Sequence, residues 1–406
     1  MTRDRTRVLF LNTATRPPLG ADVAVLSDIM RCLPRTAYEV HAGCAPGSRQ
    51  APTPTFAAFS RVPDVRVHPV DLGPELSGLT GTRKALAALR SLGVVRDLYQ
   101  LARVVRRDRI DIVHSNDRPR DAAVAVLLAR TTGVKCVVHV HVAYGAWMSR
   151  LRKWSIRRAD ALVAISSFVK ESLIAAGHEP STIHVVLNGI DPQKWRPTGS
   201  RDDVRRELTI PPDAPVVLTV CRLFPAKGPA ELIRALPAIQ AVHPDVRLLI
   251  VGEEMVSGYQ RKLSSLAQEL QVQDHVIFAG WRNDVPRLME AADVYAMPSF
   301  GEPYGLVYVE AMAMKLPVVG LRNGGTPEVV DDEVTGLLSD PGDLPGLTEH
   351  LLTLLEAPAL RHEMGRRGRD RVEALFTTQR MAEDVDSMYQ RLISATLYQR
   401  RRRRQG

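Results

Sequence analysis

Short apolar runs alternate with segments of helical spacing along most of the chain. Arg7–Leu11, Tyr38–Cys44 and Lys135–His141 are such runs, and a helical segment or a turn-rich loop follows each of them. Apolar runs bounded by turn residues are typical of buried parallel strands, and the segments between them are typical of amphipathic helices. The alternation therefore predicts an α/β protein with doubly wound parallel sheets. Gly47–Pro63 is rich in proline, serine and alanine, and we expect it to be irregular.

The alternation is interrupted once and then restarts. The interruption, Asn188–Pro212, holds four prolines and two glycines, a composition that favours a linker. We therefore expect two Rossmann-like domains, at residues 1–198 and 199–376, with a cleft between them. A helical segment at 377–398 follows the second domain, and the arginine-rich residues 399–406 predict a disordered tail.

The composition is that of a globular protein without a membrane span. Of 406 residues, 45% are apolar and 24% are charged. No apolar run approaches the roughly 18 residues that a membrane span needs. The first run, around Val8–Leu11, is too short for a signal peptide, so we expect a cytoplasmic location. The four cysteines are widely spaced and are expected to be reduced thiols.

Positive charge is concentrated in the first half of the chain. Residues 1–199 hold 29 Lys and Arg against 16 Asp and Glu, whereas residues 200–406 hold 25 against 29. Such asymmetry favours an anionic partner, namely a membrane surface, a phosphorylated acceptor or nucleic acid, although solvated faces explain it equally well. Of the three, we expect no nucleic acid.

The segment Trp147–Arg158 bears on whether the anionic partner is a membrane surface. It places Trp147, Leu151 and Trp154 on one side of a predicted helix and basic residues on the other. Such a helix would suit peripheral contact with an anionic membrane, at the inner face. Packing of the apolar side against the neighbouring sheet is the alternative.

Two carboxylates flank a glycine within Gly301–Val319, a stretch that lies between two predicted strands. Ligands of parallel α/β domains bind where strands end and helices begin. Glu302 falls in that turn, and Glu310 falls within the helix that Gly305 opens. Carboxylates accept hydrogen bonds from sugar hydroxyls, and the backbone N–H groups of Tyr304–Leu306 would hold phosphate oxygens. The alternative is a helix-dipole glutamate followed by a surface glutamate.

Two cations follow the first strand of the second domain. Arg222 and Lys227 lie in VCRLFPAKG, where a planar fork and a point charge together suit a diphosphate, although both could be plain surface cations. Gly20 opens the first helix and would let a ligand approach the backbone there, unless it is only a turn glycine. The chain contains neither a GxGxxG nor a GxxxxGK[ST] motif, which argues against a dinucleotide or a P-loop site.

His139 and His141 alternate along one strand and so face the same side of the sheet. No third residue has ligand spacing, so we expect no metal there. We interpret His141, at the strand end, as a substrate contact and His139 as a packed residue. Asn116 and Asp117 follow another strand, and they belong either to the acceptor region or to a plain surface loop.

Taken together, these motifs resemble those of retaining nucleotide-sugar glycosyltransferases of family 4, which have the GT-B fold. The resemblance covers nearly the whole chain. It rests on the order and spacing of Gly20, His141, ADALVAIS, VVLNGID, CRLFPAKG, LLIVGEE, VIFAGW, ADVYAMPS, Glu302 with Glu310, GGTPEVV and VTGLLSDPGD.

The resemblance implies a role for each residue of the second domain's motifs. Arg222 and Lys227 would bind the donor diphosphate and neutralise it as it leaves. Glu310 would bind the ribose hydroxyls. Glu302, with the amides of Tyr304–Leu306, would hold the donor sugar and the β-phosphate.

Other implied roles concern the first domain and one departure from the family pattern. Gly20 would let this domain close on the diphosphate, and His141 would touch the transferred sugar. The helix Thr377–Ser394 would cross back onto the first domain. The usual double glycine reads Leu19-Gly20 here. The usual Gly-acid-Gly begins at Gly252, a donor-binding position, but its second glycine is replaced by Glu254.

The resemblance also implies a reaction. A hexosyl group would pass from a UDP- or GDP-linked sugar to a hydroxyl of a small molecule, a glycan or a lipid-linked acceptor, with retention and without a metal or other cofactor. Two alternatives stay open. One is a retaining phosphorylase or nucleotide-sugar epimerase on the same fold, and the other is an inactive nucleotide-sugar-binding protein.

Overall fold

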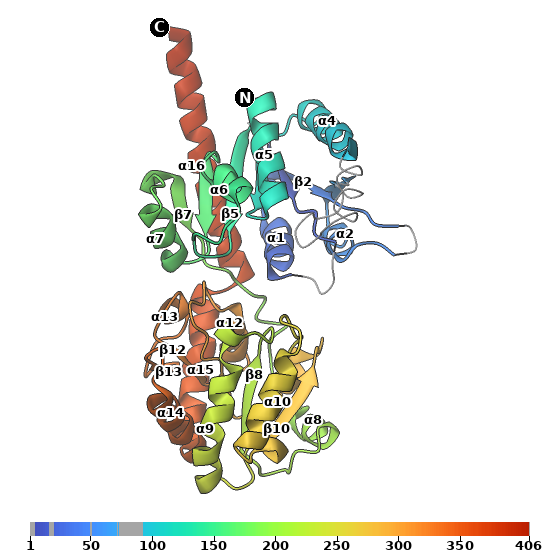
Figure 1. Ribbon diagram of the computed structural model, residues 1–406. Coiled ribbons are helices and arrows are strands. Elements are labelled where there is room, and N and C mark those ends of the chain that lie inside the picture. Colours follow the sequence, from blue (N-terminus) through green and yellow to red (C-terminus); the bar gives the residue numbers. More distant parts are fainter. Residues whose placement is uncertain (1–4, 16–19, 49–50, 71, 73–91, 406) are drawn as a thin grey trace. The chain divides into compact units, whose positions relative to one another are not determined.

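The computed structural model describes residues 5–15, 20–48, 51–70, 72 and 92–405 (Figure 1). The chain divides into two compact units. Unit 1 comprises Met1–Leu187 and Thr378–Gly406, and unit 2 comprises Asn188–Thr377. Each unit is built on one parallel sheet, so the predicted pair of doubly wound α/β domains is confirmed. The cleft between them stays a prediction.

The sheet of unit 1 has the strand order β3-β2-β1-β4-β5-β6-β7, and every pair is parallel. Its strands are β1 (Thr6–Leu11), β2 (Tyr38–Cys44), β3 (Val65–Pro69), β4 (Ile112–Asn116), β5 (Lys135–Val140), β6 (Ala161–Ala164) and β7 (Ile183–Val185). Its helices are α1 (Ala21–Cys32), α2 (Pro54–Ser60), α4 (Leu92–Arg107), α5 (Pro119–Thr132), α6 (Arg150–Ile156), α7 (Ser167–Ala175) and α16 (Thr378–Gln405). The amphipathic, basic segment Thr82–Arg109 also predicts a helix. The structure describes it from Leu92 onward, as α4, and residues 82–91 lie outside the described part of the chain.

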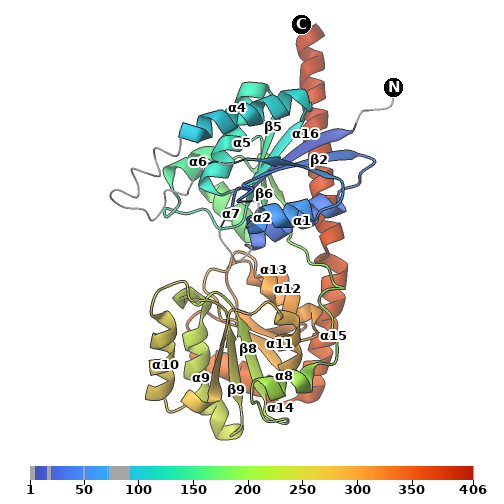
Figure 2. The same ribbon diagram turned by 90° about the vertical axis from the view of Figure 1, so that its right-hand side faces the viewer.

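Helix α16 belongs to the core of unit 1, although it follows unit 2 in the chain (Figure 2). Its residues Met381, Val385, Met388 and Tyr389 are fully buried in the cluster that β1, β2 and α1 also form. The Tyr389 hydroxyl is hydrogen-bonded to Nδ1 of His114 on β4. Burial of these apolar side chains stabilises the attachment of the C-terminal helix.

The sheet of unit 2 has the order β10-β9-β8-β11-β12-β13, the strand order of a doubly wound nucleotide-binding fold. Its strands are β8 (Val216–Val220), β9 (Arg247–Val251), β10 (Val276–Gly280), β11 (Val294–Ala296), β12 (Val318–Leu321) and β13 (Gly336–Ser339). Its helices are α8 (Arg201–Glu207), α9 (Pro229–Val242), α10 (Tyr259–Glu269), α11 (Val285–Ala291), α12 (Leu306–Ala313), α13 (Thr326–Val329), α14 (Leu344–Glu356) and α15 (Pro358–Leu375).

The predicted linker is folded onto unit 2. Helix α8 lies within it, and the guanidinium of its Arg205 is almost fully buried, where it donates to Asp293 and to four backbone carbonyls. Upstream, the carboxylate of Glu290 accepts hydrogen bonds from the backbone of Thr198, Gly199 and Ser200. Unit 2 begins at Asn188, earlier than the expected limit after residue 198. The carbonyl of Asn188 accepts a hydrogen bond from Tyr304, and Arg369 donates to the carbonyls of Pro192 and Trp195, so this segment is attached to unit 2.

Two other segments also differ from expectation. Helix α2 lies within Gly47–Pro63, where Thr53 caps it by accepting a hydrogen bond from the N–H of Phe56 and Pro54 occupies its first turn. Helix α16 continues to Gln405, through most of the tail that we expected to be disordered. Arginine is a good helix former, and no breaker interrupts the run. Among the described residues, no helix has the length and apolar character to cross a membrane.

Candidate active site

The loop after β8 turns sharply to aim Lys227 at the loop after β11. A 3-10 turn, Pro225–Lys227, ends at Gly228, whose φ of 75° is left-handed. A Cβ at this glycine would lie 2.3 Å from the carbonyl oxygen of Pro298. The two loops thus pass so closely that only glycine fits, and this contact fixes where Lys227 points.

Lys227 and Glu302 form a largely buried ion pair. The Lys227 ammonium donates to Oε2 of Glu302, and the hydroxyl of Ser299 donates to the same oxygen over 3.1 Å. Only 9% of the Glu302 side chain is exposed. The backbone of this loop is also fixed, because the N–H of Gly325 donates to the carbonyl of Glu302 over 2.7 Å. The structure therefore brings together two residues that lie far apart in sequence and that were predicted to share one site.

The start of α12 leaves backbone donors free. Gly305, at a φ of 89°, precedes the helix, and no side chain caps it. Within the described part of the chain, the N–H groups of Tyr304, Gly305 and Leu306 have no hydrogen-bond acceptor. The Tyr304 side chain is buried and donates to the carbonyl of Asn188, so its own contribution to a ligand is limited to its backbone. Free amides at a helix start favour an anion.

Glu310 lies farther along α12 and is partly buried. Burial raises the pKa of its carboxyl to about 8. No described residue forms a hydrogen bond or an ion pair with this carboxyl. A partly buried carboxyl without a protein partner is costly, and the alternative of a solvated surface glutamate does not fit it.

Arg222 follows β8, and Gly252 follows the neighbouring strand β9. The guanidinium of Arg222 is exposed and has no partner among the described residues. Gly252 has a φ of 144°, and a Cβ there would lie 1.8 Å from the carbonyl oxygen of Cys221. Gly252 therefore permits a close approach of the β8 and β9 loops. Glu254, which replaces a family glycine, caps α10 by accepting from the N–H groups of Gly258 and Gln260 over 2.7 and 2.8 Å.

Unit 1 holds a second polar cluster, where β4 and β5 end. Oδ1 of Asn116 accepts a hydrogen bond from Nε2 of His141 over 3.1 Å. Asp117 forms a buried ion pair with Arg152. Asn116 and Asp117 are both buried, so the alternative of a plain surface loop is wrong for both. His139 is packed, as predicted, with its ring stacked on that of His141 at 4.5 Å.

Asp22 joins these side chains, although its role was missed in the sequence. Its carboxylate accepts from Asn12 over 3.1 Å, from Asn116 over 3.2 Å and from Arg118 over 2.9 Å. Burial raises its pKa, but the charges of Arg118 and His141 oppose this, and the pKa is lowered overall. Its place two residues after the helix-opening Gly20 was the one available signal.

Gly20 itself has an ordinary φ of −69°, so its backbone conformation does not require glycine. A Cβ there would lie 2.2 Å from Oδ1 of Asp22, so a larger residue would require the Asp22 side chain to shift. Leu19 lies outside the described residues. The expected roles of Gly20 and His141 toward a donor stay predictions.

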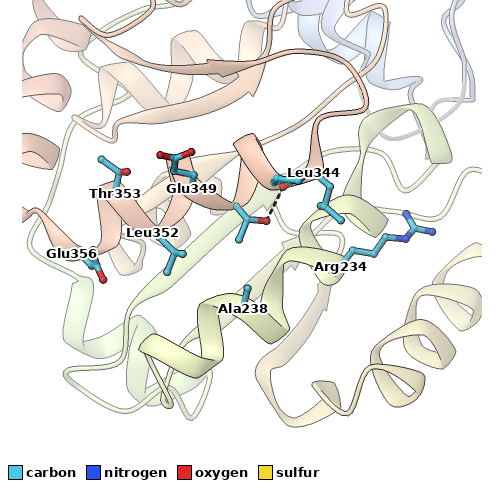
Figure 3. Close-up of a pocket in the computed structure, with 9 residues that line it drawn as sticks. Arg234, Ala238, Leu344, Glu349, Leu352, Thr353 and Glu356 are labelled. Carbon is cyan, nitrogen blue, oxygen red and sulfur yellow. Dashed lines mark hydrogen bonds between the residues drawn. The ribbon is translucent and has the colours of Figure 1, made fainter.

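A separate hollow of about 570 Å³ lies between α9 and α14 (Figure 3). Arg234 and Ala238 line it from α9, and Leu344, Glu349 and Leu352 line it from α14. None of the predicted site residues lines this hollow. We therefore assign it no part in the chemistry.

Comparison with known proteins assigns the chain to a family. The family models "Glycosyl transferase 4-like domain" and "Glycosyl transferases group 1" match residues 20–189 and 200–371. A GDP-mannose-dependent monoacylated alpha-(1-6)-phosphatidylinositol monomannoside mannosyltransferase of Corynebacterium glutamicum is 30% identical over 308 residues, which are 72% of this chain and 79% of that protein. An N-acetyl-alpha-D-glucosaminyl L-malate synthase of Bacillus anthracis is 28% identical over 306 residues, or 71% of this chain and 77% of that protein.

Solved structures agree in fold. Anabaena Alr3699/HepE in complex with UDP has a TM-score of 0.78 at 23% identity, covering 95% of this chain and all of that chain. WaaG, a glycosyltransferase involved in lipopolysaccharide biosynthesis, has a TM-score of 0.68 at 20% identity, covering 93% of this chain and 99% of that chain. The protein therefore belongs to the family 4-like glycosyltransferases and has their GT-B fold.

Proposed function

We propose that this glycosyltransferase takes its sugar from a UDP- or GDP-linked donor and transfers it to a hydroxyl with retention and without a metal. One observation carries the proposal. Within unit 2, an unpartnered carboxyl, Glu310, lies on the same helix as the free amides of Tyr304–Leu306, and the Lys227–Glu302 pair adjoins that helix. Groups that accept hydrogen bonds from hydroxyls and groups that donate hydrogen bonds to phosphate thus lie together in unit 2.

The proposed donor contacts follow from the chemistry of each group. The Glu310 carboxylate accepts hydrogen bonds from two ribose hydroxyls, which provide the partners that the protein does not. The exposed Arg222 and the Lys227 ammonium bind the diphosphate, and the amides of Tyr304–Leu306 bind its β-phosphate. Once the diphosphate weakens its ion pair with Lys227, Glu302 accepts hydrogen bonds from hydroxyls of the sugar.

During the proposed reaction, positive charge develops on the anomeric carbon and negative charge on the leaving diphosphate. The bond from the anomeric carbon to the phosphate oxygen breaks, and the acceptor oxygen bonds to that carbon on the same face. The acceptor proton passes to an oxygen of the leaving phosphate. Arg222, Lys227 and the helix amides stabilise the growing negative charge without reorganising. In the proposal these cations replace a metal, and Glu302 and Glu310 position the donor.

The acceptor is proposed to carry a hydroxyl and negative charge. The relatives' names mention phosphatidylinositol monomannoside and L-malate, which are both anionic and hydroxylated. The excess of basic residues at 1–199 is compatible with such an acceptor. Within unit 1, Asn116, which accepts a hydrogen bond from His141, and the ion-paired Asp117 are the proposed acceptor region, and His141 is the proposed contact for the transferred sugar.

A donor panel tests the proposal. We expect the purified protein to release UDP or GDP slowly from one nucleotide-sugar, with the same rate in EDTA, and faster once a hydroxyl acceptor is added. The product's anomeric configuration, read by NMR, should match the donor's. A product that forms only when inorganic phosphate is the acceptor would indicate a phosphorylase. Conversion of one nucleotide-sugar into its epimer without any acceptor would indicate an epimerase. Tight nucleotide binding without turnover would indicate an inactive binding protein.

We also propose peripheral contact of unit 1 with an anionic membrane. The expected helix is shorter than predicted, because α6 begins at Arg150 and Trp147 precedes it, and Trp154 is half-buried. Trp147 is 64% exposed and Leu151 is 46% exposed, beside basic residues of α6, so packing against the sheet does not account for these two. We expect salt-sensitive binding to phosphatidylglycerol vesicles that the double change Trp147→Ala, Leu151→Ala weakens. Ile174→Ala, a similarly exposed apolar change on α7, is the control. Equal binding of all variants would exclude this contact.

A further inference from the structure

Three potential metal ligands converge in unit 1 away from the proposed reaction site. Nδ1 of His41 on β2 and Nε2 of His68 on β3 lie 2.9 Å apart. Oδ2 of Asp108, which follows α4, lies 3.9 Å from the first nitrogen and 4.0 Å from the second. Among the described residues, this is the one group of three such side chains whose ligand atoms lie this close.

We propose that His41, His68 and Asp108 bind a divalent transition-metal ion of the zinc class. Two imidazole nitrogens and one carboxylate oxygen are a preferred donor set for zinc, with water as the fourth ligand. Metal–ligand bonds of about 2.0–2.1 Å place tetrahedral ligand atoms about 3.3 Å apart. The two nitrogens must therefore separate slightly and the carboxylate must approach, which small side-chain rotations achieve.

The two facing nitrogens share one hydrogen bond, so ion binding requires the donor ring to carry its proton on its other nitrogen. His41 is fully buried, whereas 15% of the His68 side chain is exposed, which leaves a path for an ion to enter.

Glu39 supports His41 from the other side of its ring. Oε1 of Glu39 lies 3.5 Å from Nε2 of His41, a nitrogen without another partner. A carboxylate behind a ligating histidine fixes its tautomer and raises its basicity. Arg7 and Arg66 in turn hold Glu39 at 3.2 and 3.0 Å.

The positive charge of Arg107, beside Asp108, disfavours the binding of a metal ion. Arg107 donates to both oxygens of Asp108, over 2.7 and 2.8 Å. An incoming metal ion must displace it from Oδ2, and the 70% exposed Arg107 side chain is free to move. His41 and His68 lie on β2 and the edge strand β3, and β1 separates these strands from β4 and β5, whose ends hold Asn116 and His141. We therefore assign the ion a structural role that does not depend on the proposed donor chemistry.

The test uses the full chain, treated with a chelator and then titrated with Zn²⁺ or Co²⁺. We expect one ion per chain after gel filtration, visible Co²⁺ absorption bands of a four-coordinate site, and a thermal midpoint raised by several degrees with Zn²⁺. His68→Ala, on an edge strand and partly exposed, should lose all three effects. His184→Ala, partly exposed on the opposite edge strand β7, should retain them.

A second variant separates ligation from general destabilisation. Glu39→Gln keeps all three ligands, and we expect it to weaken Zn²⁺ affinity by about 10- to 100-fold without abolishing uptake. Failure of the parent protein to retain metal would overturn the proposal and leave a hydrogen-bonded histidine pair. Equal retention by His68→Ala would overturn it too. Because the readouts are metal uptake and stability, they are independent of the glycosyl-transfer assay.

Discussion

Glu310 should reduce the stability of the protein in return for donor binding, and Glu310→Gln separates the two effects. Burial raises the pKa of this carboxyl from 4.5 to about 8. Between these two pH values the unfolded chain has lost the proton and the folded chain keeps it. The contribution of Glu310 to the free energy of unfolding therefore falls as the pH rises through this window and is constant above it.

The size of this effect follows from the shift. Each pKa unit is worth about 1.4 kcal/mol, so a change from 4.5 to about 8 sets an upper bound of about 5 kcal/mol. Partial exposure of the side chain reduces this to about 2–4 kcal/mol. Glutamine has the same shape and does not ionise. We therefore expect Glu310→Gln to match the parent near pH 5 and to exceed its stability by about 2–4 kcal/mol at pH 9.

The same change should weaken donor binding. At pH 9, where Glu310 is ionised, a hydrogen bond from a ribose hydroxyl to its carboxylate contributes about 1.5–3 kcal/mol, so the Kd for UDP or GDP should rise by about 10- to 150-fold. Urea unfolding at pH 5, 7 and 9 measures the first effect, and calorimetric titration with the nucleotide measures the second. Glu349→Gln, an exposed carboxylate on α14, is the control and should change neither.

Two results would refute this reasoning. If the stability difference between parent and variant is the same at pH 5 and pH 9, Glu310 does not titrate abnormally. If the nucleotide binds the variant as tightly as the parent, Glu310 does not contact it. A variant that is stabilised at high pH and binds nucleotide weakly would agree with both steps.

Three further predictions concern other positions. Lys227→Ala should lower turnover about 100- to 1,000-fold, measured as UDP or GDP release, because the leaving charge loses a fixed cation; near-normal turnover would contradict this. Gly252→Ala should lower the urea midpoint, because its Cβ would lie 1.8 Å from the carbonyl oxygen of Cys221; an unchanged midpoint would be evidence against the close approach. Tyr389→Phe should destabilise the protein by about 1–3 kcal/mol and speed hydrogen exchange in α16, since it leaves a buried nitrogen of His114 unpaired. Unchanged hydrogen exchange in α16 would show that this bond is unimportant.

The strands were predictable because buried parallel strands are continuous apolar runs. Tyr38–Cys44 was expected with the bounds that β2 has, and Lys135–His141 differs from β5 by one residue. Helix α8 was missed because Arg205, a charged residue in a proline-rich stretch, has no local signature of burial. Its partners, Asp293 and distant carbonyls, are apparent only in the folded chain.

The site was predictable in part for a similar reason. Strand ends and helix starts can be located from a pattern, so Lys227 and Glu302 were each expected at a binding edge. That they pair with each other depends on β8 and β11 being neighbours in the sheet. Asp22 and the His41–His68–Asp108 group were missed, because each joins residues from three separate segments.

The sequence by itself determined the two α/β domains, the limits of most strands and the family. Periodicity and turn residues act over short stretches of chain, so a linear pattern carries this information. The tertiary structure decided which charges are paired and which carboxyl is left without a partner. Lys227 is bound to Glu302, whereas Glu310 is partly buried with a pKa raised to about 8. Pairing and burial arise from contacts between distant segments, and these form only when the sheet order brings the segments together.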